Sequence, residues 1–241
     1  MSQAFLSVDG VSMRFGGLLA VDSVAFDVSQ GEIVSIIGPN GAGKTTLFNL
    51  LTGQLTPTQG RILFEGADVS RAPPQKRARY GFGRTFQISQ TLTSLTVLEN
   101  AMVGSFLRHP HLRDAARHAQ GVLELVGLSA RASVRAGALT LSERRRLEVA
   151  RALATEPRIL LLDEVMAGLN ATEVQQVVEL VQMLNERGYT FLVIEHNLKV
   201  VRTFSRRVVV LNRGAKLTEG TAEEVLGNPQ VVEAYVGRKR Q

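Results

Sequence analysis

One segment constrains the fold of this chain more than any other: residues 38–45 read GPNGAGKT. The apolar stretch Glu32–Ile37 precedes it and predicts a buried strand, while Thr45–Thr52 follows it with the pattern of a helix. Glycine reaches backbone conformations that other residues avoid, so three glycines this close together predict a tight loop. A strand, a glycine-rich loop and a helix in this order predict an α/β core with a parallel sheet.

The loop fits the phosphate-binding pattern G-x-x-x-x-G-K-[ST], in which backbone N–H groups point inward and hold phosphate oxygens. The N-terminus of the following helix adds partial positive charge. Lys44 is expected to reach the β- and γ-phosphates of a nucleotide, and the Thr45 hydroxyl to bind Mg²⁺. A structural turn with a solvated lysine is the alternative. The candidate ligand-binding residues are Gly38, Pro39, Asn40, Gly41, Ala42, Gly43, Lys44, Thr45 and Thr46.

A second apolar run, Ile159–Leu162, ends in two acids, Asp163 and Glu164. In open α/β sheets, ligands bind at the carboxyl edge of the sheet, where this strand would end. Asp163 is therefore a candidate to hold Mg²⁺ through its water shell, and Glu164 is a candidate to polarise an attacking water. A strand that runs into an acidic turn would give the same sequence.

The remaining segments predict strands and helices in alternation. Residues 5–36 predict several short antiparallel strands, and residues 90–155 predict a helical insertion without a strong strand signal. Further strands are expected at Arg61–Phe64, Thr190–Ile194 and Val208–Leu211. The helix expected at Thr172–Arg187 ends before Gly188, and one of its faces carries Val174, Val177, Val178, Val181 and Leu184.

The composition excludes several classes of protein. The 241 residues contain no cysteine, which rules out disulfides and thiolate metal sites. No apolar run approaches the ~20 residues of a membrane-spanning helix, and the N-terminus does not read as a secretory signal. A nucleic-acid surface would interleave basic and aromatic residues, yet only 5% of the residues are aromatic. The net charge of +6 therefore does not by itself indicate a type of binding partner, and we expect no nucleic-acid partner.

The two motifs above, together with three further segments, resemble the ATP-binding subunit of an ABC transporter over residues 5–237. The resemblance implies one domain, with a P-loop NTPase α/β core, an N-terminal antiparallel β subdomain and a helical signature subdomain inserted at about 90–155. It implies that Gln87 is the Q-loop residue that contacts nucleotide and Mg²⁺, and that His196 senses the γ-phosphate. Phe15 takes the place of the adenine-stacking aromatic, for which a core aromatic is the alternative. The matching D-loop, which faces a partner subunit, is Ala167, Gly168, Leu169 and Asn170.

Narrower segments resemble one branch of that family, the ATPases of bacterial branched-chain amino acid importers, and within it the first of two paired ATPases. These segments include RRRLEVARAL, the AGLN form of the D-loop and the ending NPQVVEAYVG. The resemblance implies ATP and Mg²⁺ as cofactors and a peripheral place on the cytoplasmic face of the bacterial inner membrane. The partners that it implies are two transmembrane permease subunits, a second ABC ATPase or another copy of this chain, and an extracytoplasmic substrate-binding protein.

Three alternative functions stay open. The ATPase of a lipid or lipopolysaccharide exporter is similar in sequence. A soluble ABC clamp acting on DNA would need a long coiled coil between Lys44 and Leu139, and one acting on ribosomes usually has two cassettes; the sequence shows no sustained heptad and one cassette. A regulatory module that dimerises without useful turnover is disfavoured by the presence of Glu164 and His196.

The sequence departs from the family at its LSGGQ signature, where it reads Leu139-Thr140-Leu141-Ser142-Glu143. Both glycines are replaced, and Ser142 stands where a missing side chain would let the loop approach phosphate. We therefore expect a composite pair of sites in a heterodimer, in which the site that uses this signature turns over slowly. Val165 also replaces the proline that usually follows the catalytic glutamate. Local sequence predicts a capping box of Thr140 and Glu143, then a buried stripe of Leu147, Ala150 and Leu153.

Three histidines, His109, His111 and His118, match no motif of the family. Their spacing and the absence of accompanying carboxylates predict a poor metal site, so we expect them to be surface residues.

Overall fold

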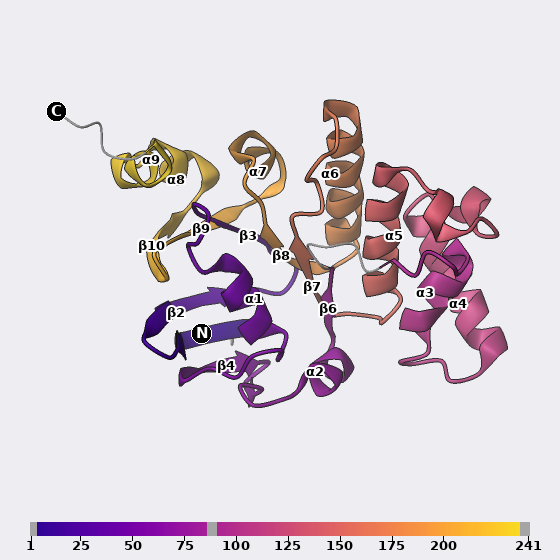
Figure 1. The fold of residues 1–241 in the computed structure, drawn as a ribbon, viewed down its shortest axis with the longest axis horizontal. Coiled ribbons are helices and arrows are strands. Elements are labelled where there is room, and N and C mark those ends of the chain that lie inside the picture. Colours follow the sequence, from indigo (N-terminus) through magenta and orange to yellow (C-terminus); the bar gives the residue numbers. More distant parts are fainter. Residues whose placement is uncertain (1–3, 86–90, 237–241) are drawn as a thin grey trace. The chain divides into compact units, whose positions relative to one another are not determined.

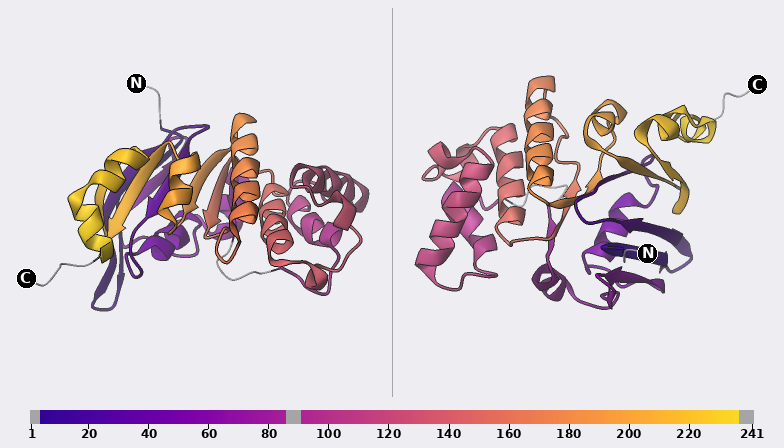
Figure 2. Two further views of the ribbon diagram at one scale, coloured as in Figure 1. Left: turned by 90° about the horizontal axis from the view of Figure 1, so that it is seen from above. Right: turned by 180° about the vertical axis from the view of Figure 1, so that it is seen from behind.

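The computed structural model describes residues 4–85 and 91–236, and the chain divides into two compact units. The first unit is formed by Met1–Arg77 together with Asn185–Gln241, and the second by Ala78–Leu184. Because colours follow the sequence in Figures 1 and 2, the first unit holds both ends of the colour scale. The sheets and helices confirm the predicted α/β class, and the helical insertion predicted at about 90–155 lies within the second unit.

An antiparallel sheet forms the N-terminal part of the first unit (Figure 1). Its strands are β1 (Leu6–Phe15), β2 (Leu18–Val28), β4 (Gln59–Phe64) and β5 (Ala67–Asp68), in the order β2-β1-β4-β5. The antiparallel pairing predicted for this region is confirmed, but the prediction of several short strands is wrong, because β1 and β2 are both long. Shifts of register between Val8 and Arg14 bend this one hairpin and interrupt the simple alternation of buried and exposed residues.

A second group of strands in the first unit leads into the glycine-rich loop. β3 (Ile33–Ile37) pairs in parallel with β8 (Thr190–Ile194) and with β9 (Arg207–Asn212), and β10 (Ala215–Gly220) pairs antiparallel with β9. Every residue of β3 and β8 is buried, as expected for near-continuous apolar strands of a parallel sheet. The strands predicted from these apolar runs are therefore confirmed.

The first unit also contains helices from both ends of the chain. α1 (Lys44–Leu51) follows the loop, and α2 (Pro74–Tyr80) carries Arg77. Near the C-terminus the chain forms α7 (Leu198–Phe204), α8 (Ala222–Gly227) and α9 (Pro229–Val236), which the sequence pattern did not predict. These three helices pack on the strands through a buried core. Its members are Ile37, Val201, Val208, Val210, Ala222, Val225 and Val231.

The second unit is mainly helical, with α3 (Val97–Ser105), α4 (Leu112–Leu125), α5 (Leu141–Leu153) and α6 (Ala171–Glu186). α3 packs against both α4 and α5. Two parallel strands accompany the helices: β6 (Phe82–Arg84) and β7 (Ile159–Asp163). On α6 the predicted apolar face is buried, apart from the half-buried Val174, and Gly188 lies beyond its end with φ of +92°. Throughout residues 4–85 and 91–236, each helix is too short or too polar to cross a bilayer.

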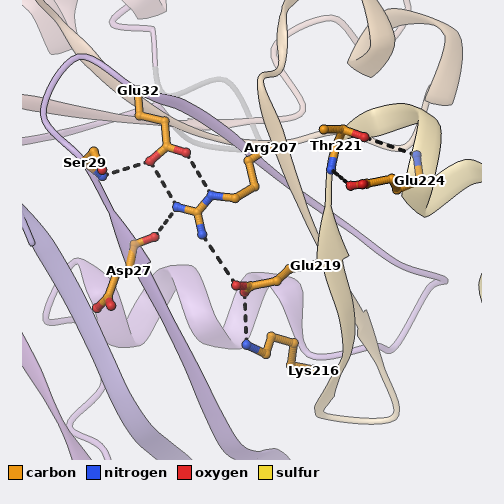
Figure 3. Close-up of polar contacts among 8 residues, drawn as sticks. All are labelled: Asp27, Ser29, Glu32, Arg207, Lys216, Glu219, Thr221 and Glu224. Carbon is orange, nitrogen blue, oxygen red and sulfur yellow. Dashed lines mark hydrogen bonds and ion pairs between the residues drawn. The ribbon is translucent and has the colours of Figure 1, made fainter.

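A network of ion pairs centred on Arg207 joins three segments of the first unit (Figure 3). Arg207 Nε lies 2.8 Å from Glu32 Oε1 and its Nη2 lies 3.0 Å from Oε2 of the same carboxylate. The guanidinium also donates to the backbone oxygen of Asp27, and it lies 3.7 Å from Glu219 Oε1. Burial alone would raise the pKa of Glu32, but hydrogen bonds from Arg207 and from the Ser29 N–H outweigh it, so the pKa lies below its ordinary value.

Replacing Arg207 by Ala is expected to lower the free energy of unfolding by about 2–3 kcal/mol at pH 7, because it leaves Glu32 charged without its main partner. The pKa of Glu32 in the folded protein is depressed, so its contribution is complete above the ordinary pKa of 4.5 and is lost as the pH falls through the folded value. The difference in the free energy of unfolding between the wild type and Arg207→Ala, measured with urea, should therefore shrink below about pH 4.5.

Lys216 provides the control, because its Nζ lies 3.0 Å from Glu219 in an ion pair of which both side chains are about one-third exposed. Its replacement by Ala should change the free energy of unfolding by less than about 1 kcal/mol. Equal losses for the two variants, or a loss for Arg207→Ala that does not depend on pH, would contradict the role given to the Arg207–Glu32 pair.

Candidate functional site

The glycine-rich loop joins β3 to α1, and its glycines are required by local geometry. Gly38, Gly41 and Gly43 all have positive φ, of +153°, +79° and +97°. A Cβ at Gly38 would lie 2.2 Å from the Leu211 backbone oxygen, and one at Gly43 would lie 2.6 Å from that of Ala20. Alanine at Gly38 or Gly43 would therefore push the loop away from its neighbours, and the tight loop predicted from the sequence is confirmed.

Lys44 is folded back over this loop. It is only 7% exposed, and its Nζ donates to the backbone oxygens of Gly38 and Pro39 at 2.7 and 3.0 Å. Thr45 is exposed and Thr46 is half-buried, both in the first turn of α1. Among the described residues, no side chain caps the N-terminus of α1, where Gly43 is the N-cap, so the loop presents an ammonium group beside this helix N-terminus. This is the combination that binds phosphate oxygens.

A cavity of about 630 Å³ borders the same loop within the first unit. Residues 39–42 line one part of it, and Arg213 and Glu233 line other parts. Lys44 and Thr45 do not line it, so the cavity is adjacent to the position expected for the phosphates and does not coincide with it.

Two further candidates of the first unit lie at the surface. Phe15, at the end of β1, is 45% exposed, so the alternative that it is a core aromatic is wrong. His196 is exposed after β8, and the next residue, Asn197, caps α7 by accepting hydrogen bonds from backbone N–H groups. Gln87 lies outside the described residues.

Asp163 is buried at the carboxyl end of β7 and paired with an arginine that the sequence analysis did not single out. Its Oδ2 lies 3.2 Å from Arg84 Nη2, and the two side chains are 1% and 9% exposed. The Asp163 N–H donates to Thr85 Oγ1 at 3.0 Å, which fixes the backbone of the aspartate to the end of β6. Burial lowers the pKa of Arg84, and the attraction of Asp163 opposes that shift. The parallel register of β6 and β7 brings these residues together.

Glu164 follows at a strained backbone position, with φ of +51°. Residues other than glycine lose roughly 1 kcal/mol in this left-handed region, and such strain is concentrated at functional sites. The backbone oxygen of Glu164 accepts a hydrogen bond from the Ala167 N–H at 3.1 Å, and the Glu164 side chain is half-buried, while Val165 and Met166 are buried. The turn thus anchors two apolar side chains and leaves the acid accessible.

The segment Ala167–Asn170 lies next to the start of α5 within the second unit. A Cβ at Gly168, whose φ is +80°, would lie 3.2 Å from Leu141 Cδ2. Asn170 begins α6: its Oδ1 accepts from the Glu173 N–H, and its own N–H donates to the Glu173 carboxylate, both at 3.0 Å. The residues predicted as D-loop and signature are therefore neighbours, and Asn170 has a structural role at the start of α6.

The predicted capping box at the start of α5 is confirmed. Thr140 Oγ1 accepts from the Glu143 N–H at 3.2 Å, and the Glu143 carboxylate accepts from the Thr140 N–H at 2.9 Å. These bonds, with an ion pair to Arg131, hold the pKa of Glu143 below its ordinary value. Ser142 is 3% exposed and its Oγ has no hydrogen-bond partner among the described residues, whereas Leu141 is 44% exposed. The stripe formed by Leu147, Ala150 and Leu153 is buried, as predicted.

The prediction that the histidines are surface residues without accompanying carboxylates is wrong for two of the three. His109 and His118 are only partly exposed, and both lie beside the carboxylate of Glu156. Glu156 is 38 residues beyond His118 in the sequence, and only the packing of α4 and α5 beside α3 brings them together. His111 is exposed, as expected.

Comparisons with known proteins agree with these motifs. Residues 21–167 match the family model described as "ABC transporter", and residues 215–239 match a second model, "Branched-chain amino acid ATP-binding cassette transporter". The second match covers β10, α8 and α9, the C-terminal elements that pack on β3 and β9.

Similar relatives cover nearly the whole chain. The high-affinity branched-chain amino acid transport ATP-binding protein LivG of Escherichia coli is 44% identical, and BraF of Pseudomonas aeruginosa is 43% identical; each alignment covers 98% of this chain and 99% of the relative. A crystal structure of the ADP conformation of an ATP-binding cassette from an ABC transporter superposes with a TM-score of 0.90 at 33% identity, over 98% of this chain and all of that one.

Proposed function

Because this chain belongs to the ABC transporter family as one of its ATP-binding cassettes, we propose that it hydrolyses ATP to power the import of branched-chain amino acids. It is an ABC-type ATPase and binds nucleotide. The observation that carries the choice of substrate class is the 43–44% identity, over almost the full length, to ATP-binding proteins of branched-chain amino acid transport.

In the first unit, we assign nucleotide binding to residues 38–46 and adenine stacking to Phe15. Exposure of Phe15 leaves its ring free to meet a base. The ammonium of Lys44 now bonds to Gly38 and Pro39, and it would exchange these carbonyls for the β- and γ-phosphates. His196 is assigned to the γ-phosphate, which its exposed position after β8 permits.

Mg²⁺ fits the oxygen donors that the chain offers, since this ion prefers hydroxyl, carboxylate and water ligands. The Thr45 hydroxyl, the Asp163 carboxylate and the Gln87 side chain would hold it, and the ion would neutralise charge on the phosphates. Arg84 pairs with the Asp163 carboxylate and fixes its orientation. Glu164, on its strained turn, would take the proton of the attacking water.

The proposed assembly has this chain on the cytoplasmic face of the bacterial inner membrane, bound to two transmembrane permeases. It would pair with a second ABC ATPase, or with another copy of itself, and the transporter would receive substrate from an extracytoplasmic binding protein. In the pair, residues 140–143 would serve the nucleotide held by the partner, while the D-loop faces the partner. ATP-driven closure of the pair would switch the permeases between inward- and outward-facing states.

Restoring glycine at both Leu141 and Ser142 is expected to raise the ATPase rate of the assembled complex several-fold. Thr140 already caps α5, and the Ser142 side chain occupies buried space at its N-terminus, so both features limit how closely a phosphate can approach. The rate should be measured under saturating ATP, with Leu153→Met in the buried stripe as the control. An unchanged rate would argue against a slow second site.

The proposed function is tested by purifying the tagged chain from mild-detergent membranes of its own source and identifying the proteins bound to it. Two multi-spanning permeases, a second ATPase and a binding protein that takes up leucine, isoleucine or valine would support an importer. Recovery with lipid-export components would support the exporter alternative, and recovery with ribosomes or DNA-bound proteins would overturn the transport proposal.

A further inference from the structure

Two histidines and one glutamate converge in the second unit, outside the motifs used for ATP hydrolysis. His109 lies in the loop after α3, His118 lies on α4, and Glu156 lies in the loop after α5. Glu156 Oε1 is 2.5 Å from His109 Nε2 and 3.5 Å from His118 Nε2. The donor atoms of all three residues lie within 4.8 Å of one another, and the two rings are 4.6 Å apart.

A buried serine orients His118. Ser105 Oγ lies 2.9 Å from His118 Nδ1 and 3.4 Å from the backbone oxygen of Ala101. If the hydroxyl donates to that carbonyl, it accepts from the Nδ1–H, and the Nε2 lone pair then faces the Glu156 carboxylate. In this tautomer the Nε2 lone pair of His118 and the carboxylate of Glu156 repel each other. A cation bound to both would remove that repulsion. Fixing one ring nitrogen in this way is how proteins prepare a histidine to bind a metal.

The backbone holds Glu156 in place at an energetic cost. Its φ is +53°, in the left-handed region that glycine or asparagine adopts more easily. The Glu156 N–H donates to the Leu153 oxygen at 2.9 Å, and the His109 N–H donates to the Ser105 oxygen at the same distance. Both ends of the shortest contact in the cluster are therefore fixed by the main chain, and a glutamate stands where glycine or asparagine would adopt the backbone conformation more easily.

We propose that His109, His118 and Glu156 form a binding site for a divalent transition metal ion of the zinc class. Two imidazoles and one carboxylate are a donor set that suits Zn²⁺, whereas Mg²⁺ and Ca²⁺ prefer oxygen ligands alone. Around a tetrahedral zinc ion, neighbouring donor atoms lie ~3.3 Å apart, so the His118–Glu156 separation already fits and the His109–Glu156 pair must open by ~1 Å. Three protein ligands leave the fourth position to water. The ion would link the segments after α3 and α5 to α4.

The test uses the untagged full chain, stripped of metal with a chelator, without nucleotide and with Zn²⁺ as the probe. Calorimetric titration should show one equivalent of Zn²⁺ bound, and Co²⁺ in its place should give the absorption spectrum of a tetrahedral site. At about a hundredfold excess over Kd, Zn²⁺ should raise the Tm by ~5 °C. His118→Ala and Glu156→Gln should each weaken binding at least tenfold and remove the rise in Tm.

His111→Ala is the matched control, since it removes an exposed histidine from the same segment and should leave binding and Tm response unchanged. The proposal is overturned if the wild-type chain does not bind Zn²⁺, or if His118→Ala and Glu156→Gln bind it as tightly as the wild type. It is also overturned if Glu156→Gln lowers the Tm equally with and without Zn²⁺, because the cluster is then an ordinary ion pair. None of these readouts depends on ATP turnover or transport.

Discussion

Replacing Glu164 by Gln is expected to lower the ATP turnover of the assembled complex at least about a hundredfold, with ATP binding nearly unchanged. A positioned general base contributes roughly 10²–10⁴ to the rate, and the amide cannot accept the proton of the attacking water. Glutamine has the same shape and keeps the strained turn at residues 164–167, so the loss would reflect the missing proton acceptor. Phosphate release and equilibrium ATP binding should be measured on the same preparation.

Glu179→Gln is the matched control, because it makes the same chemical change on the exposed surface of α6 and should leave turnover within about twofold of the wild type. Turnover above a tenth of the wild-type rate in Glu164→Gln would contradict the role assigned to Glu164. Such a result would mean that most ATP is hydrolysed at the site that uses the partner's phosphate loop. The site that contains Glu164 would then be the slower of the two.

The second large effect, a loss of stability, is expected from replacing Arg77. This fully buried arginine bonds to the end of α1, the helix that follows the glycine-rich loop. Its guanidinium donates to the backbone oxygens of Leu50 and Leu51, the last residues of α1, and also to those of Ser70 and Ala72. Carbonyls at the end of a helix lack intrahelical partners and carry partial negative charge. Burial lowers the pKa of Arg77 to about 10, so the group stays charged at neutral pH.

Arg77→Met is expected to lower the free energy of unfolding by about 3–5 kcal/mol, because four backbone oxygens lose their hydrogen bonds from the guanidinium. Arg77→Lys keeps the charge but lacks the planar fork, and it should lose about half as much. The midpoint of urea unfolding, measured with a constant slope, gives both values.

Arg79→Met, on the exposed side of the same helix, serves as the control and should change the stability by less than about 0.5 kcal/mol. If the Arg77 and Arg79 variants unfold at the same urea concentration, the carbonyl oxygens at the end of α1 do not depend on Arg77.

Much of the fold could be predicted because it depends on local patterns. The apolar runs in residues 33–37, 159–163 and 190–194 could hardly form anything but buried strands, and they are β3, β7 and β8. The capping box at Thr140 was readable because both of its hydrogen bonds join residues three apart. The hairpin of β1 and β2 was predicted as shorter pieces because its bends come from shifts of pairing between two strands, which one strand's sequence does not show.

In the candidate site too, residues in local motifs could be predicted, whereas residues that meet only in the folded chain could not. Motif residues such as Lys44 and Asp163 were predicted from spacing and stay predictions, whereas the ABC family that the motifs indicated is confirmed by the comparisons. Arg84 and the Glu156 cluster were missed because their partners are distant in sequence and meet only through strand register or helix packing. The sequence around these residues carried a weak signal at most. Arg84 stands three residues before Gln87, the predicted Q-loop residue, and Glu156 lies in no recognisable motif.

The most direct test of the central claim is uptake of labelled leucine into proteoliposomes that contain the purified complex, ATP and the cognate binding protein. We expect ATP-dependent accumulation with the wild-type chain, and its loss with Glu164→Gln in proportion to the loss of ATP turnover. ATP hydrolysis without accumulation of leucine, isoleucine or valine would contradict the claim, as would accumulation that survives Glu164→Gln.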